Sequence, residues 1–113
     1  MPGVGKGAKA AQVRLPRAGK IGKVFYKDWT AAAQSGRHDM ARAKEVMTLL
    51  IANDGPLGAE WQDHGLKGKD WTGARECHVK GDLLLVYVLG DEPKGQGTVE
   101  FVRLGTHAEL FGR

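Results

Sequence analysis

The 113-residue chain contains a single cysteine, Cys77, and no long apolar run. One cysteine cannot form a disulfide within the chain, and it excludes every zinc pattern built from several cysteines. The longest apolar run, Leu83 to Leu89, is far shorter than the roughly 20 residues that cross a membrane. The N-terminus also lacks the apolar region of a secretory signal. We therefore expect a cytoplasmic protein without a membrane partner.

Acidic residues are missing from the first 27 positions, which hold seven basic residues. Positions 28–113 hold ten basic and thirteen acidic residues, so this part carries −3 although the whole chain carries +4. Residues 1–10 are rich in glycine and lysine and predict a flexible basic tail. The length of the remainder, residues 11–113, predicts one domain. A basic segment of this kind is a candidate for binding a polyanion.

Several motifs with a known chemistry are absent. No GxGxxG or GxxxxGK[ST] pattern follows a strand and opens a helix, so the sequence does not support a nucleotide cradle. No HExxH pattern is present either, and the spacing of the histidines does not predict a metal site. These histidines are His38, His64, His78 and His107. We expect neither a metal nor a cofactor.

Two adjacent amphipathic helices are predicted in the first half of the chain. Apolar residues recur at helical spacing over residues 22–34, and Ser35-Gly36 ends the pattern. Asp39 can cap a second helix, which stops at the turn formers of residues 53–56. The apolar stripe of this second helix is Met40, Ala43, Met47, Leu50 and Ile51. We expect a helical hairpin that covers a sheet.

Strands dominate the second half. The predicted strands are residues 75–80, 83–89 and 98–104, with a further short strand over 11–15. Pro16 limits the short strand to an edge or a strand end. Lys80-Gly81-Asp82 has the right length for a hairpin turn. Helices followed by consecutive strands predict an α+β fold, with a largely antiparallel sheet and the helices on one face.

Three histidines lie at positions typical of catalytic groups. His64 belongs to a long loop, residues 56–73, which Trp61, Leu66 and Trp71 are expected to pin to the core. His78 is on the polar face of a strand, opposite to Cys77, and His107 follows the last strand. The nearby carboxylates are Asp63, Glu76 and Asp82, which can orient imidazoles. By itself, each histidine is also compatible with a structural role.

Imidazoles and carboxylates without a nucleophilic serine or cysteine suit the cleavage of RNA. The 2′-hydroxyl of RNA is the nucleophile, so the protein supplies a base, an acid for the leaving 5′-oxygen and cations for the phosphorane. Histidine, with an unperturbed pKa of ~6.5, serves as either acid or base near neutrality. Cys77 is expected to be a small core residue.

Five stretches then carry a family resemblance. They are HDMARAKEVMTLLIANDGPL, WQDHGLKG, WTGARECHV, GDLLLVY and RLGTHAELFG. Together they resemble the YafQ branch of the RelE-like bacterial toxins, over about Phe25 to Gly112. Three positions depart from the family pattern. Glu76 stands where the family usually has aspartate, and Ala74 and Leu83 stand where it commonly has aromatic residues.

The resemblance implies an mRNA endoribonuclease of a type II toxin–antitoxin pair, which cuts messenger RNA in the ribosomal A site and binds a cognate antitoxin. It implies two N-terminal helices packed on a small, largely antiparallel sheet of four to five strands. The implied catalytic residues are His64, His78, His107, Glu76 and Asp82. The implied substrate-binding residues are Arg103 for phosphate and Phe111 for a base. Lys67 and Lys69 are further candidates for offsetting phosphate charge.

Our mechanistic hypothesis makes His64 or His78 the base, with Asp82 orienting one of them, and makes His107 the acid. The expected products are a 2′,3′-cyclic phosphate and a 5′-hydroxyl. One alternative is a non-enzymatic module that blocks translation by binding RNA or the ribosome. Another is a metal-dependent hydrolase that uses the same histidines. The basic N-terminal segment would dock on ribosomal RNA or on an acidic antitoxin.

Overall fold

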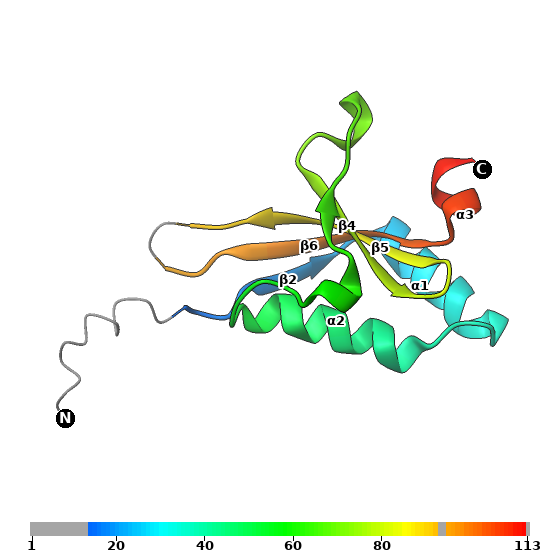
Figure 1. Cartoon of the computed structure of the whole chain (residues 1–113), viewed down its shortest axis with the longest axis horizontal. Helices are drawn as coiled ribbons and strands as arrows, with labels where there is room; N and C mark the ends of the chain where they lie inside the picture. Colours follow the sequence, from blue (N-terminus) through cyan, green and yellow to red (C-terminus); the bar gives the residue numbers. More distant parts are fainter. Residues whose placement is uncertain (1–13, 93–94, 113) are drawn as a thin grey trace, which may run out of the picture.

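The computed structural model describes residues 14–92 and 95–112, so the predicted tail over residues 1–10 lies outside the described residues. Five strands form one sheet in the order β2-β6-β5-β4-β3 (Figure 1). The strands are β2 (Ala18–Ile21), β3 (His64–Gly65), β4 (Ala74–Lys80), β5 (Leu83–Gly90) and β6 (Thr98–Gly105). Strand β2 pairs in parallel with β6, whereas every other pair of neighbours in the sheet is antiparallel. The predicted α+β fold is confirmed.

Two helices, α1 (Lys23–Ser35) and α2 (Met40–Ala52), pack on one face of the sheet, close to their predicted bounds. Helix α1 ends at Gly36, whose φ of +71° lies in the left-handed region that glycine adopts without strain. The carboxylate of Asp39 caps α2 by accepting a hydrogen bond from the Arg42 N–H at 3.0 Å. The capping residue predicted for α2 is thus confirmed.

The main core lies between these helices and the sheet. Its fully buried members include Phe25, Val46, Trp61, Cys77, Leu85, Tyr87, Val99 and Phe101. Alternate residues of β4 and β5 face it, as the period of a strand requires, whereas a register shift in the β5–β6 pairing interrupts the alternation of β6. Val46, which is buried, was missing from the predicted stripe of α2.

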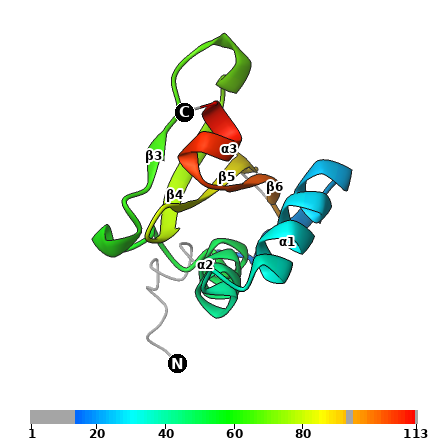
Figure 2. The ribbon, with the colours of Figure 1, turned by 90° about the vertical axis from the view of Figure 1, so that its right-hand side faces the viewer.

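A third helix, α3 (His107–Phe111), covers a smaller apolar cluster on the other face of the sheet (Figure 2). That cluster contains Ala74, Leu84, Val86 and Leu110. The prediction that the helices occupy one face is therefore incomplete. Thr106 and Glu109 form a reciprocal capping box at the start of α3. The Thr-x-x-Glu pattern was the sequence signal for this helix.

Two predicted segments differ from the structure. The strand expected over residues 11–15 is wrong where the chain is described, because strand pairing starts only at Ala18, after Pro16. The predicted loop over residues 56–73 contains the edge strand β3 and two short 3₁₀ turns, η2 (Ala59–Trp61) and η3 (Lys69–Trp71). Within the described part of the chain, no helix is both long and apolar enough to cross a membrane.

Candidate active site

Pairing of β3 with β4 brings two predicted site residues face to face. His64 lies directly opposite Glu76 in the antiparallel register, so their side chains share one face of the sheet. The Nε2 atom of His64 is 3.4 Å from Oε2 of Glu76, and Nε2 of His78 is 3.6 Å from the same oxygen. The Glu76 side chain is only 5% exposed. We call His64, Glu76 and His78 the inner unit.

A backbone contact fixes the orientation of the His64 ring. Its Nδ1 atom lies 2.9 Å from the carbonyl oxygen of Gln62. Because a carbonyl can only accept, Nδ1 carries the proton in this contact. In a neutral ring the lone pair then belongs to Nε2, the atom that faces Glu76. Proton uptake at Nε2 would therefore place the new positive charge beside a carboxylate.

A second imidazole–carboxylate pair, the outer unit, consists of His107 and Asp82. His107 is the first residue of α3, and Asp82 lies in the β4–β5 turn. The two meet at 3.2 Å through Nδ1 of the histidine and Oδ1 of the aspartate. Both side chains are exposed, at 51% and 60%. The structure corrects our hypothesis that Asp82 orients His64 or His78, because Glu76 is the carboxylate that contacts those two rings.

Aromatic side chains border the outer unit. The rings of His107 and Phe111, one helical turn apart on α3, have centroids 5.8 Å apart. The Trp71 ring meets Phe111 edge-on, at 5.3 Å between centroids. Trp71 was predicted to pin its loop to the core, and it does so by packing against the cluster under α3. Flat apolar surfaces beside the imidazoles are suited to stacking against a nucleotide base.

An open groove of about 650 Å³ joins parts of the two units. It is lined by His64, Leu66, Lys67, Trp71, Glu76, His107 and Phe111. Five of these residues were predicted from the sequence, whereas Leu66 and Trp71 were not predicted as site residues. Two aromatic or aliphatic residues in a polar loop beside a histidine were the available signal. His78 does not line this groove but lines a neighbouring polar pocket. Lys69 does not line the groove either.

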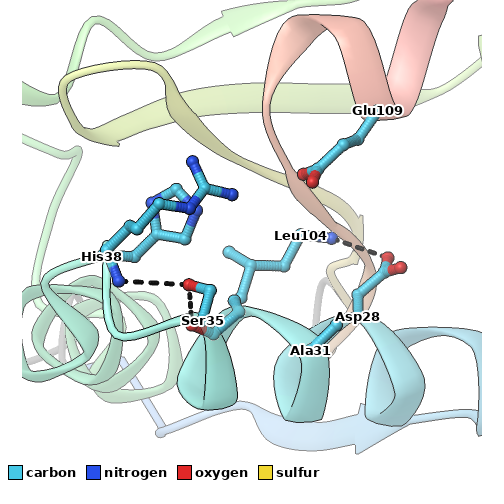
Figure 3. A pocket seen from close by; sticks show the side chains of 8 residues that line it. Asp28, Ala31, Ser35, His38, Leu104 and Glu109 are labelled. Carbon is cyan, nitrogen blue, oxygen red and sulfur yellow. Dashed lines mark hydrogen bonds between the residues drawn. The ribbon is translucent and has the colours of Figure 1, made fainter.

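Arg103 is engaged elsewhere. Its guanidinium binds Asp28 of α1, with Nε 2.7 Å from one carboxylate oxygen and Nη2 3.2 Å from the other. This hydrogen bonding raises the pKa of Arg103. Asp28 also accepts the Leu104 backbone N–H, beside a cavity of about 230 Å³ between α1 and α3 (Figure 3). Asp28 thus satisfies the edge of β6 beyond the point where β2 ends.

The remaining predictions concern residues of the core. Cys77 is fully buried in the main core, as predicted, and burial raises the pKa of its thiol from 9.0 to about 12. Leu83 also lies in the main core, and Ala74 lies in the cluster under α3. These two departures from the family pattern are therefore packed inside the protein, whereas the third, Glu76, lines the groove.

The sequence of this chain is similar to those of known bacterial toxins. The family model described as "Bacterial toxin of type II toxin-antitoxin system, YafQ" matches residues 17–112. The mRNA interferase toxin YafQ of Escherichia coli (strain K12) is 46% identical over 80 residues, which are 71% of this chain and 80% of that protein.

Solved structures agree. The E. coli DinJ–YafQ toxin–antitoxin complex contains a chain that matches with a TM-score of 0.73 and 41% identity, over 87% of this chain and 100% of that one. A metal-bound toxin from Helicobacter pylori matches with a TM-score of 0.68 and 40% identity, over 84% of this chain and 99% of that one.

Proposed function

This chain belongs to the YafQ family of bacterial type II toxin–antitoxin toxins, and from that premise we propose that it is an mRNA interferase, an endoribonuclease that arrests translation. The observation that carries the proposal is the groove that His64, Glu76 and His107 line together. A scissile phosphate between them would have an imidazole available on each side. This arrangement is what 2′-hydroxyl attack with general acid–base catalysis needs.

His64 is our candidate for the base, since it lines the groove and His78 does not. Its Nε2 atom would take the proton of the 2′-hydroxyl, and the 2′-oxygen would then attack phosphorus. Glu76 would stabilise the imidazolium that forms. His78 lies 3.6 Å from the same carboxylate oxygen and stays the alternative candidate for the base.

His107 is our candidate for the acid. Its Nδ1 contact with Asp82 leaves Nε2 free to deliver a proton to the departing 5′-oxygen. The products would be a 2′,3′-cyclic phosphate and a 5′-hydroxyl end. Lys67, which lines the groove, would offset charge on the phosphate, and Phe111 with Trp71 would stack against a base.

The substrate would be messenger RNA in the ribosomal A site, which places the activity in the cytoplasm. Residues 28–113 carry −3, so this region has no excess of positive charge to bind RNA. We infer that the ribosome supplies much of the alignment. Lys20, Lys23 and Lys27 would help to dock on ribosomal RNA. Arg103 stays a candidate phosphate contact, provided that RNA replaces Asp28 as its partner, and Lys69 stays a weaker one.

A cognate antitoxin is the expected protein partner, as DinJ is for the E. coli toxin. An apolar groove of about 490 Å³ between α1 and α2 fits that role. Its walls include Ile21, Phe25, Tyr26, Trp29, Met47 and Ile51, with Lys44 beside them. Tyr26 and Ile21 are exposed, and none of the described residues that line the groove is acidic. An amphipathic, acidic segment of the antitoxin would match it.

Tyr26→Glu should weaken binding of the antitoxin encoded beside the toxin gene, whereas Leu49→Glu, outside the groove, should not.

The decisive experiment maps the 5′ ends of messenger RNA after induction of the chain in a bacterium. We expect new ends at codon positions, accompanied by growth arrest, and we expect both to disappear in His107→Ala. His38→Ala is the matched control, because His38 lines the separate cavity beside α1. Growth arrest that persists without new ends, in the wild type and in His107→Ala alike, would favour the non-enzymatic alternative.

A metal-dependent hydrolase is the second candidate, because the H. pylori relative was solved with a metal bound. Across residues 14–92 and 95–112, no group of three or more histidine, cysteine, aspartate or glutamate residues is placed to hold a metal ion. Cleavage of ribosome-bound RNA should survive a chelator selective for transition metals. Loss of cleavage that added zinc or copper restores would instead support the metal mechanism.

A further inference from the structure

Strand β3 consists of only two residues, His64 and Gly65, at the edge of the sheet. The position of His64 nevertheless depends on its register. Successive side chains of a strand point to opposite faces, so a slip by one residue would turn His64 away from the groove. Two residues of pairing give little energy to prevent such a slip. Something outside the ladder must hold the register.

Asp63, the residue before β3, is held by hydrogen bonds from two neighbouring strands. Its carboxylate accepts hydrogen bonds from the Arg75 guanidinium, the shortest at 2.8 Å, and from the hydroxyl of Tyr87. Tyr87 is 1% exposed and belongs to the main core. Burial first, and then the hydrogen bond to Asp63, raise the pKa of Tyr87. The hydroxyl therefore stays protonated and keeps donating to Asp63.

The two faces of the sheet explain how this cluster acts on His64. Arg75 and Tyr87 lie opposite each other on β4 and β5, and they share the face that carries the main core. Asp63 joins them there, while the next residue, His64, faces Glu76 on the other side. Gly65 is paired with Arg75, and a Cβ atom at this position would lie 3.8 Å from Nη1 of the arginine, which is an ordinary contact.

The slipped arrangement is unfavourable for a second reason. A slip that moved Asp63 into the place of His64 would bring its carboxylate toward the buried Glu76 carboxylate, and two like charges at low exposure repel strongly. It would also separate Asp63 from both of its donors and leave the Tyr87 hydroxyl buried without a partner, which is costly. The hydrogen bonds that anchor Asp63 to Arg75 and Tyr87, and the repulsion between Asp63 and Glu76, both favour the observed register.

We propose that Asp63 is a positioning residue, which uses its anchor on Arg75 and Tyr87 to fix the register of β3 and so hold His64 against Glu76. This inference rests on the proposed nuclease function in one respect, that His64 takes part in cleavage. Asp63 itself does not line the groove. Its influence on the reaction runs through His64 alone.

A double-mutant cycle tests this route, with single-turnover cleavage of messenger RNA on programmed ribosomes as the measurement. Asp63→Asn should lower the rate about 10- to 10²-fold, because small displacements of a reacting group have effects of this size. Substrate affinity should change little. In the His64→Ala background the same substitution should have no further effect. Tyr87→Phe, which keeps the ring in the core, should act in the same direction with a smaller factor.

Asp91→Asn is the matched control. Asp91 also binds an arginine through both carboxylate oxygens, with Arg17 at 2.8 Å and 3.4 Å, but it lies at the start of the β5–β6 connection. Its replacement should leave the cleavage rate unchanged. An equal rate loss from Asp63→Asn with and without His64 would overturn the proposal, because the effect would then not run through His64.

Hydrogen exchange provides a readout that does not depend on activity. The Leu66 N–H donates to the Ala74 carbonyl at 2.9 Å, just beyond β3. Its exchange should accelerate at least about tenfold in Asp63→Asn and Tyr87→Phe, while amides of the β5–β6 ladder keep their protection. Unchanged Leu66 exchange in both variants would refute the anchor. If His64→Ala cleaves normally but Leu66 exchange accelerates as expected, the catalytic assignment fails and the anchor stands.

Discussion

The inner and outer units use the same chemical groups, but their carboxylates lie in opposite environments. In the inner unit, Glu76 is buried in the sheet and both histidines approach one of its oxygens. In the outer unit, Asp82 and His107 meet in contact with solvent, on a turn and at the start of a five-residue helix. The rings of His64 and His107 are about equally exposed, at 52% and 51%, so the difference lies in the carboxylates: water and salt reach Asp82, whereas Glu76 is buried. Removal of the carboxylate charge should therefore lower the cleavage rate much more in the inner unit than in the outer unit.

The two units are also held by different means. Strand register places His64 opposite Glu76, with Asp63 anchored on the far face. A capping box places His107, because Thr106 and Glu109 fix the first turn of α3. Sheet register allows two discrete arrangements, whereas a short helix at the surface can move gradually. We therefore expect substitutions around the inner unit to displace His64 in one large step, and substitutions around the outer unit to displace His107 gradually.

The largest effects should come from the imidazoles themselves, in both units. His64→Ala and His107→Ala should each lower the single-turnover cleavage rate about 10²- to 10⁴-fold, since each removes a proton-transfer group. Rate measurements on programmed ribosomes check this prediction, with His38→Ala as the control. A loss below tenfold for His107→Ala would break the comparison, because the outer unit would then lie outside the chemistry.

Next in size is the protection of Cys77, which follows Glu76 on β4. A thiol reacts as its thiolate, and a rise in pKa from 9.0 to about 12 lowers the thiolate fraction about 10³-fold at neutral pH. Alkylation of the native protein at pH 7 should be slower than that of a free thiol by at least this factor. Asp82→Asn should leave the rate unchanged. Fast alkylation of the wild type would show that the sheet around the inner unit opens readily.

Glu76→Gln should lower the cleavage rate about 10²-fold, because the imidazolium formed at His64 would lose its buried counter-charge. The amide is close in size to the carboxylate, so the fold should be retained. Far-UV circular dichroism and the cleavage rate together check this. A loss no larger than that of Asp82→Asn would erase the distinction between the two carboxylates.

Asp82→Asn should lower the rate about fivefold at most, since exposed ion pairs contribute roughly 0.2–1 kcal/mol and 1.36 kcal/mol corresponds to tenfold. Because the contact is screened, the ratio between wild type and variant should shrink further as salt increases. Cleavage rates at low and high salt measure this. A loss of 10² or more that salt does not change would show that Asp82 is shielded when RNA is bound.

The smallest expected effect is on stability and concerns the exposed ion pair between Asp91 and Arg17. Hydrogen bonding to Arg17 lowers the pKa of Asp91 below its usual range. The stabilisation is therefore present above the ordinary aspartate pKa of ~3.9, and it is lost as the pH falls through the lowered value. Asp91→Asn should reduce the free energy of unfolding by less than about 1 kcal/mol at pH 7, with a smaller difference in acid. Urea unfolding at several pH values tests both points. A difference that grows in acid would contradict the assigned sign.

Periodic patterns in the sequence were enough to predict the main elements. Helical spacing predicted α1 and α2, Asp39 predicted the cap, and the alternation in residues 75–80 placed Cys77 in the core and Glu76 on the other face. Elements without a period were missed. Strand β3 has two residues and α3 has five, too few for a repeat to appear. These two elements carry site histidines.

The sequence by itself determined the family and the α+β fold, and its imidazoles and carboxylates indicated the chemistry that we propose. Which carboxylate serves which imidazole was decided only by the tertiary structure. Asp63 is next to His64 in the sequence, yet it lies on the opposite face of the sheet and binds Arg75 and Tyr87. Glu76 is twelve positions from His64, yet strand register brings them together. Closeness in the sequence predicts only local contacts. Pairing across a sheet depends on contacts between distant segments, which the order of the chain does not specify.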